Sequence, residues 1–225
     1  MQDCEQFEPE SAAWQSAHYE EPYYSQRTAK LPVKLGRLAI LSMPSNSRIL
    51  DVCCGRGEAL SVLRTFGFQD LEGLDSTLPS NRDSNGLRLH RGDAQALPFP
   101  DESFDVILNL HALHHMGSAE GVSRFLRECH RVLKPGGTLA IVDFPGSPQI
   151  RLLFWLLRNK CLALTGNLRN FARILDAEWG YLYGYLQAWP KVRQVLERSQ
   201  FRTVQKEQRF FLYYRVMRRG GEGEN

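Results

Sequence analysis

The chain has 225 residues, of which 43% are hydrophobic and 24% charged, and its formal net charge is +3. This is typical of one globular domain that forms its core without disulfides or a structural metal. Basic residues are scattered among acidic ones, so we expect no nucleic-acid partner. No apolar run approaches the roughly 20 residues of a membrane-spanning helix. Five cysteines and no signal peptide predict a soluble, cytoplasmic protein with reduced thiols.

Residues 1–43 are predicted to form an N-terminal arm and a helix, Thr28 to about Met43, that cover the site. Short apolar runs then alternate with helical patterns, as in parallel βαβ units. We therefore expect a Rossmann-like, doubly wound α/β fold. The predicted strands are Arg48–Cys53, Leu71–Leu74, Leu87–Arg91, Phe104–Leu110 and Thr138–Asp143, and the main helices are Glu58–Thr65 and Gly121–Leu133.

The alternation stops after Asp143. Residues 148–190 have a helical pattern, and residues 202–218 are rich in β-branched and aromatic residues, which predicts two closing strands around Gln208 and Arg209. The expected organisation is a domain over 44–219, a helical and aromatic cap insertion over 145–190, and a disordered tail over 220–225.

A glycine-containing turn is the strongest functional signal. The strand that includes Asp51 runs into Gly55 and Gly57, and a helix follows at once. Glycines let backbone approach a ligand closely, and the helix start offers unpaired amides. The spacing lacks the third glycine of a dinucleotide turn, and an acid before it would repel a pyrophosphate. A ligand with a positive amino group fits better; the alternative is a tight turn with a structural Asp51.

A second acid follows the next predicted strand. Asp75 ends Leu71-Glu-Gly-Leu-Asp75, and a carboxylate at this strand end can accept hydrogen bonds from both hydroxyls of a ribose. Together with the glycine turn, Asp75 predicts a nucleoside ligand.

These residues stand in a series of motifs. The chain contains Leu50-Asp-Val-Cys-Cys-Gly-Arg-Gly57, Gly92-Asp-Ala-Gln-Ala-Leu-Pro-Phe-Pro-Asp-Glu-Ser-Phe-Asp105, Leu113-His-His115 and Arg131-Val-Leu-Lys-Pro-Gly-Gly137. In this order they resemble the class I S-adenosylmethionine-dependent methyltransferases, in particular the small-molecule group that includes quinone-biosynthesis enzymes. The resemblance covers about residues 48–144 and implies a mostly parallel seven-stranded sheet with an antiparallel last strand.

The resemblance also implies residue roles in binding S-adenosylmethionine (SAM). Asp51 and the Gly55–Gly57 backbone would face the methionine part, with Cys53 in place of the family's first glycine. Asp75 would hold the ribose. The remaining roles are Asp93 and the Ala94 amide on the adenine, and Asn109 beside the sulfonium.

Three histidines follow the predicted fourth strand. If the methyl acceptor must lose a proton, His111 or His114 is the candidate base near neutral pH; the alternative is that these residues only pack. No metal site is predicted, because no acidic or cysteine partner lies close to the histidines in the sequence.

The acceptor is predicted from the region after the core. Residues 150–164 combine apolar and basic residues, which suits a lid over an apolar pocket or contact with a membrane surface. Residues 179–190 concentrate aromatics, which favours a flat or lipophilic acceptor.

The function expected from the sequence is SAM-dependent transfer of a methyl group to a small, aromatic or lipophilic acceptor. The alternative is a non-catalytic SAM-binding or interaction protein on the same fold. A nicotinamide-dependent oxidoreductase is disfavoured by the missing three-glycine fingerprint. The sequence leaves open the acceptor atom and the oligomeric state.

Overall fold

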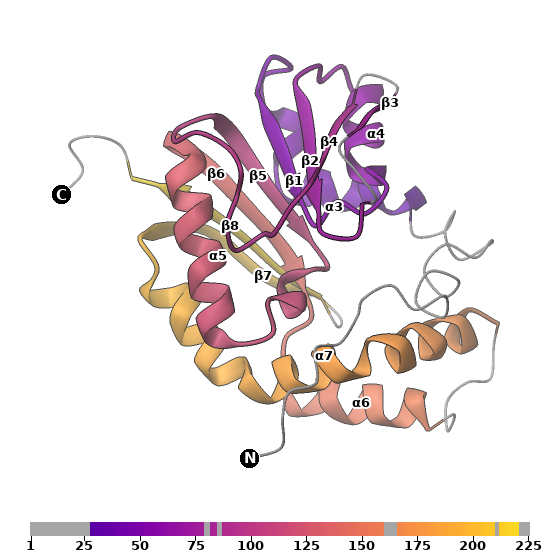
Figure 1. Ribbon diagram of the computed structural model, residues 1–225. Helices are drawn as coiled ribbons and strands as arrows, with labels where there is room; N and C mark the ends of the chain where they lie inside the picture. The colour runs from indigo at the N-terminus through magenta and orange to yellow at the C-terminus, as the bar shows by residue number, and fades with distance from the viewer. Residues whose placement is uncertain (1–27, 79–81, 85–86, 160–165, 210–211, 221–225) are drawn as a thin grey trace.

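The computed structural model describes residues 28–78, 82–84, 87–159, 166–209 and 212–220, and its centre is a mixed β-sheet (Figure 1). Eight strands lie within these residues, in the order β3-β4-β2-β1-β5-β6-β8-β7. Their bounds are β1 Ile49–Val52, β2 Leu71–Asp75, β3 Arg82–Ser84, β4 Leu87–Arg91, β5 Phe104–Leu110, β6 Leu133–Asp143, β7 Phe201–Arg209 and β8 Leu212–Arg219.

The sheet order confirms the predicted doubly wound topology. Strand β1 pairs in parallel with β2 on one side and with β5 on the other. The chain therefore changes direction across the sheet between β1 and β5, and ligands of open α/β sheets bind beside such a switch point. Strand β8 runs antiparallel to both β6 and β7, as expected of the last strand. The additional strand β3 was not predicted, since its three residues are too few to show a periodicity.

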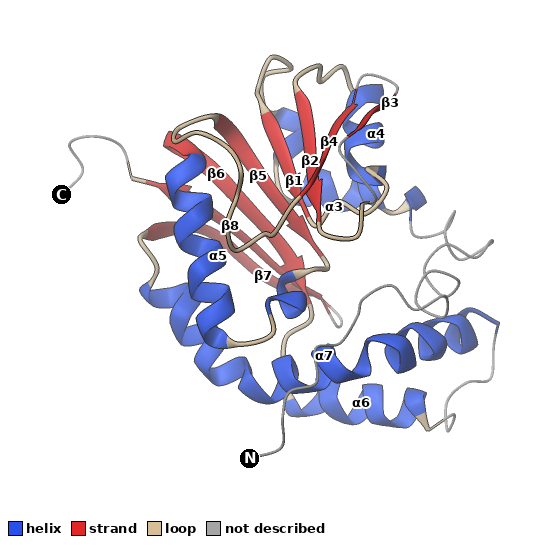
Figure 2. Cartoon of the chain, viewed as in Figure 1, coloured by secondary structure: helices blue, strands red, loops and turns tan. Residues whose placement is uncertain are grey.

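Helices occupy the connections that the sequence predicted, with shifted ends (Figure 2). The helix expected over Thr28–Met43 ends early, because Ala39 takes a left-handed conformation with φ of 58°. The helix expected from Gly121 begins at Ala119, where the Ser118 side chain accepts from the Gly121 N–H. The bounds are α3 Leu31–Arg37, η1 Ile40–Ser42, α4 Glu58–Thr65, η2 Leu113–Met116, α5 Ala119–Val132, α6 Pro148–Arg158 and α7 Gly166–Arg198.

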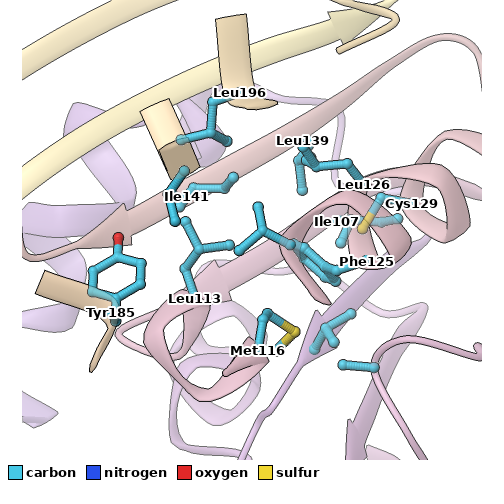
Figure 3. Close-up of a cluster of buried hydrophobic side chains, with 14 of the residues drawn as sticks. Ile107, Leu113, Met116, Phe125, Leu126, Cys129, Leu139, Ile141, Tyr185 and Leu196 are labelled. Atoms are coloured by element: carbon cyan, nitrogen blue, oxygen red, sulfur yellow. The ribbon is translucent and has the colours of Figure 1, made fainter. Parts of the chain in front are cut away.

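Helices cover both faces of the sheet (Figure 1). Along β5, Val106 and Leu108 belong to the buried cluster with α3 and α4, while Ile107 belongs to the cluster with α5 and α7. Figure 3 shows part of this second cluster, with Phe125 of α5 beside Ile107. Successive residues of a strand point to opposite faces, so a continuous apolar strand such as β5 contributes to two cores.

The connection from β6 to α6 passes against α7. A Cβ atom on Gly146 would lie 2.6 Å from the carbonyl oxygen of Leu186, too close for any other residue. Pro190 stands inside α7 and has no N–H. The Leu186 carbonyl therefore receives no helical hydrogen bond from that position. The backbone of the segment after β6 therefore packs directly against the backbone of α7 at Gly146, with no room for a side chain between them.

The region after β6 is helical, as predicted for residues 148–190. Ser147 caps α6 through the Ile150 N–H, and the buried ring of Phe154 packs edge-on against those of Phe144 and Phe171. The predicted pair of closing strands is also confirmed as β7 and β8, but Gln208 and Arg209, expected between the strands, belong to β7 and pair with β8. Residues 1–27 of the expected arm, 160–165 of the expected cap and 221–225 of the expected tail lie outside the described residues. The described helices include none long and apolar enough to span a membrane.

Candidate active site

The structure brings the predicted residues of three strands to one edge of the sheet. Asp51 on β1 lies in register with Gly73 of β2 and Leu108 of β5, so the carboxyl ends of these strands are neighbours. Asp75 ends β2 and Asn109 lies near the end of β5. The Asn109 amide donates to the carbonyl of Val52 over 3.2 Å, which joins the ends of β5 and β1 directly.

The turn after β1 has a backbone that favours glycine. Cys53, Gly55 and Gly57 have φ angles of 63°, 57° and 86°. These lie in the left-handed region, where side chains other than glycine are strained. The N–H groups of Cys53 and Cys54 both donate to the Leu74 carbonyl, at 2.7 and 3.1 Å, so the turn is fixed over the end of β2.

Three carboxylates surround this turn. Asp51 is only 3% exposed, and burial together with the charges of Glu58 and Asp75 raises its carboxyl pKa well above the ordinary value. Asp75 is 8% exposed, and its Oδ2 accepts from the Gly55 N–H over 2.8 Å. The concentration of negative charge at a buried site favours a ligand that carries positive charge.

The next part of the edge comes from the residues after β4. The Gly92 N–H donates to the Asp75 carbonyl over 3.3 Å, which places the following residues beside the end of β2. Asp93 is exposed, and its Oδ1 accepts from the Gln95 N–H over 2.8 Å; Ala94 is buried. The three segments that carry these acids and glycines therefore follow the neighbouring strands β1, β2 and β4.

Asn109 has an unsatisfied polar atom. The residue is fully buried, and its Oδ1 has no hydrogen-bond partner among the described residues. A buried acceptor in this state costs on the order of 1–3 kcal/mol. Such an atom is typical of a site that awaits a ligand or water.

His111 follows β5 and takes a strained backbone conformation with φ of 60°. Its N–H donates to the Val142 carbonyl, and its Nε2 lies 2.6 Å from the ammonium of Lys34 on α3. An ammonium can only donate, so Nε2 is the acceptor of this hydrogen bond. In this arrangement the lone pair of His111 Nε2 is already used.

His114 is held by acids from two other elements. Its side chain is 1% exposed; its Nδ1 lies 2.9 Å from Asp143 Oδ1, and its Nε2 lies 3.5 Å from Glu178 Oε2 on α7. Burial lowers the pKa of this imidazole, but the charge and hydrogen bond of Asp143 and the charge of Glu178 outweigh it and raise the pKa to about 10. His114 is then protonated at neutral pH and cannot accept a proton there.

Sequence reasoning missed three of these residues. Asp143 ends β6, and an acid at the carboxyl end of a predicted strand was a usable signal. Lys34 and Glu178 lie within helices, where a charged residue is usually solvated. Their contacts with His111 and His114 depend on how α3 and α7 pack, which the local sequence does not show.

The strand order and the turn at the β1–β5 switch point define a class I methyltransferase fold. Residues 50–141 match the family model described as "Methyltransferase domain". Residues 50–141 of this chain are therefore similar to methyltransferase domains.

Two curated relatives are similar in sequence. The phthiotriol/phenolphthiotriol dimycocerosates methyltransferase 1 of Mycobacterium ulcerans is 42% identical over 113 residues, which cover 47% of this chain and 41% of the relative. The 2-phytyl-1,4-naphtoquinone methyltransferase of Synechococcus elongatus is 31% identical over 161 residues, which cover 65% of this chain and 66% of the relative. The chain thus spans less than two thirds of the length of either relative.

A solved structure agrees on the fold. The PH0226 protein of Pyrococcus horikoshii superposes with a TM-score of 0.61 at 21% identity, covering 89% of this chain and 92% of that one. At this identity the likeness concerns the fold alone.

Proposed function

We propose that this protein transfers the methyl group of SAM to a small lipophilic acceptor, and that residues 145–190 form the cap that holds the acceptor. The observation that carries the proposal is the turn from Cys53 to Gly57, whose positive φ angles expose backbone beside the buried Asp51 and Asp75. SAM bears an ammonium and a sulfonium group, and both suit this acidic surrounding.

The amino-acid part of SAM is assigned to Asp51 and to the backbone between Gly55 and Gly57. The raised pKa of Asp51 results from burial and from neighbouring Glu58 and Asp75. A positive amino group beside Asp51 would reverse this effect and favour the carboxylate. The carboxylate of SAM would lie at the start of α4, where helix amides are unpaired.

The nucleoside part is assigned to the ends of β2 and β4. Asp75 Oδ1 accepts from the N–H and the hydroxyl of Thr77, and the rotatable hydroxyl can give way to a ribose hydroxyl. Asp93, fixed by the Gln95 N–H, would accept from the adenine amino group, and the Ala94 amide would donate to the ring.

Methyl transfer depends mainly on alignment of the acceptor atom with the methyl group and the sulfur of SAM. SAM supplies, when bound, an electrophilic methyl group on its sulfonium. Asn109, at the end of β5, would lie beside the reacting centre, where its Oδ1 has no hydrogen-bond partner among the described residues. Holding the acceptor in line with the methyl group supplies much of the rate acceleration.

The histidines are assigned to positioning. His111 or His114 as a general base stays a prediction from the sequence, and the contacts of both favour a different role. The Nε2 of His111 accepts from Lys34, and His114 is held in its protonated form by Asp143 and Glu178. An acceptor that ionises in solution needs no protein base.

The lipophilic acceptor is supported by helices α6 and α7. Leu152 and Trp155 of α6 are 58% and 52% exposed, and Tyr183 of α7 is 42% exposed. The names of the two relatives both contain a lipophilic compound, a dimycocerosate and a phytyl-substituted naphthoquinone. The same exposed side chains, with Arg151 and Arg158 nearby, suit delivery of such an acceptor from a membrane surface.

Two measurements test this function. Calorimetric titration of the full chain should show saturable, one-to-one binding of SAM and of its demethylated product. Incubation with methyl-labelled SAM and naphthoquinols should then move the label into the organic phase. We expect faster transfer to a naphthoquinol with a long apolar chain than to the unsubstituted ring.

The outcomes separate the alternatives. Absence of SAM binding would remove the whole assignment. SAM binding without transfer to any apolar or polar acceptor would favour the non-catalytic protein. Equal rates with and without the apolar chain would contradict the lipophilic acceptor and leave methyl transfer intact.

A further inference from the structure

The loop after β5 and the middle of α7 bring together two imidazoles and a carboxylate. His114 Nε2 lies 3.5 Å from Glu178 Oε2, and His115 Nε2 lies 3.6 Å from Glu178 Oε1. One ligand atom from each of the three residues lies within 4.8 Å of the others. From this geometry we propose that His114, His115 and Glu178 bind a divalent transition-metal ion of the zinc type.

The distances fit a metal centre. Metal–ligand bonds of about 2.0–2.2 Å in a tetrahedral site place neighbouring ligand atoms about 3.3–3.6 Å apart. The two histidine–carboxylate distances, 3.5 and 3.6 Å, lie in this range, each to a different oxygen of Glu178. Two nitrogens and one carboxylate oxygen form a donor set that zinc and related ions accept, and a fourth position stays open for water.

His114 is prepared as a ligand by its other nitrogen. Its Nδ1 faces the carboxylate of Asp143, which can only accept, so Nδ1 carries a proton. The Asp143 carboxylate is fixed in turn by the N–H groups of His114 and Phe144, at 2.9 and 2.7 Å. A carboxylate behind a metal-binding imidazole is the usual support of such a ligand.

An independent observation points to the same place. His114 Nε2 is buried and has no hydrogen-bond partner among the described residues. The neighbouring ring of His115 lies 4.3 Å away between centroids, so both imidazoles face the same carboxylate of Glu178. Without an ion, the protonated His114 imidazole faces the Glu178 carboxylate. A metal ion would displace the proton on Nε2, take this buried nitrogen as a ligand and neutralise the carboxylate.

The proposed metal site is open to solvent on one side. The side chain of His115 is 26% exposed, whereas those of His114 and Glu178 are 1% and 8% exposed. An ion can therefore enter on the His115 side. Once bound, it would join η2, directly after β5, to the centre of α7, and so fix the cap helix to the sheet edge. The sequence predicted no metal because the acid comes from α7, distant along the chain.

Zinc titration of the full chain tests the site. The protein is freed of metal with a chelator, then titrated with Zn²⁺ in competition with a chromophoric chelator. We expect one equivalent of Zn²⁺ to bind and to raise the melting temperature, because the ion binds only the folded chain. Co²⁺ in the same site should give the visible absorption of a four-coordinate centre. Mg²⁺ should give no shift, since it prefers oxygen ligands.

Matched variants assign the ligands. His115→Ala and Glu178→Gln should each weaken Zn²⁺ binding at least about tenfold. The controls Asp176→Asn, an exposed acid on the same helix, and His130→Gln, a histidine of α5, should bind as the parent does. His115 is partly exposed, so its variant keeps the test valid even if a His114 variant does not fold.

Three results would overturn the proposal: no saturable uptake of Zn²⁺, uptake unchanged in both ligand variants, or an equal response to Mg²⁺. SAM binding is measured on the same samples. Its retention in His115→Ala would separate loss of the metal site from loss of the proposed methyltransferase function.

Discussion

Two parts of the sheet edge differ in how they are built. The part formed by β1 and β2 comes from a continuous segment, with Asp51, the glycine turn and Asp75 close together in the chain. The part beyond β5 is assembled from η2, the end of β6 and α7. A local motif carries ligand-binding geometry within one βαβ unit, whereas a cluster of side chains from several elements depends on packing across the domain.

The largest effect is expected from removal of Asp75, the acid at the end of β2. Asp75→Ala should weaken SAM binding about 100-fold, or ~3 kcal/mol, because a charged acceptor of hydrogen bonds is lost. Calorimetry measures the affinity, and circular dichroism checks that the sheet persists.

Asp70→Ala is the matched control, since Asp70 is an exposed acid just before β2 and should leave SAM binding unchanged. Unaltered affinity in Asp75→Ala would contradict the ribose assignment.

The next effect is expected at Glu72 of β2, which lies in a cluster of charged side chains. Glu72 is 4% exposed in its side chain; burial opposes its ionisation, but hydrogen bonds from Arg48, Arg88 and His90 lower its carboxyl pKa below the ordinary 4.5. Glu72→Gln should cost about 2 kcal/mol of unfolding free energy at neutral pH.

The lowered pKa fixes the sign of the pH dependence. The contribution of Glu72 is present above the pKa of the unfolded chain and is lost as the pH falls through the lower folded value. Urea unfolding should therefore show the stability difference between parent and variant shrinking as the pH falls below the ordinary carboxyl pKa of the unfolded chain. A difference that stays constant with pH would rule out the ion pairs as its cause.

The third prediction tests the turn itself. Cys53 has a φ of 63°, which costs a non-glycine residue about 1–2 kcal/mol. Cys53→Gly should raise stability by about 1 kcal/mol after the extra chain entropy of glycine, or about 3 °C in Tm. Ala39→Gly, at φ of 58° and remote from the turn, should gain a similar amount. A lower Tm in Cys53→Gly alone would mean that thiol packing outweighs the strain.

The smallest expected effect concerns His111. His111→Gln keeps a side-chain acceptor for Lys34, so we expect kcat to fall less than about fivefold, while His111→Ala should fall further. A general base would instead lose about 10²–10⁴-fold in both variants. Steady-state turnover of the two variants distinguishes positioning from proton transfer.

The same contrast explains what the sequence could predict. The strands Leu87–Arg91 and Phe104–Leu110 and the helix Glu58–Thr65 have the bounds expected of them, because apolar pattern and glycine punctuation are local. The early end of α3 was missed, since the left-handed Ala39 has no signature in the sequence. The partners of His111 and His114 were also missed, because Lys34 and Glu178 reach them only after the helices pack.

The close passage at Gly146 limits how the acceptor specificity proposed for this protein could be redesigned. A chimera that exchanges the residues after β6 for those of a relative would need to retain Gly146 and Pro190 as the two ends of the exchanged segment. Any larger residue at Gly146 would meet the Leu186 carbonyl, and a residue with an N–H at Pro190 would let α7 close its helical hydrogen bonds differently. Such a chimera should therefore exchange the whole segment between Gly146 and Pro190.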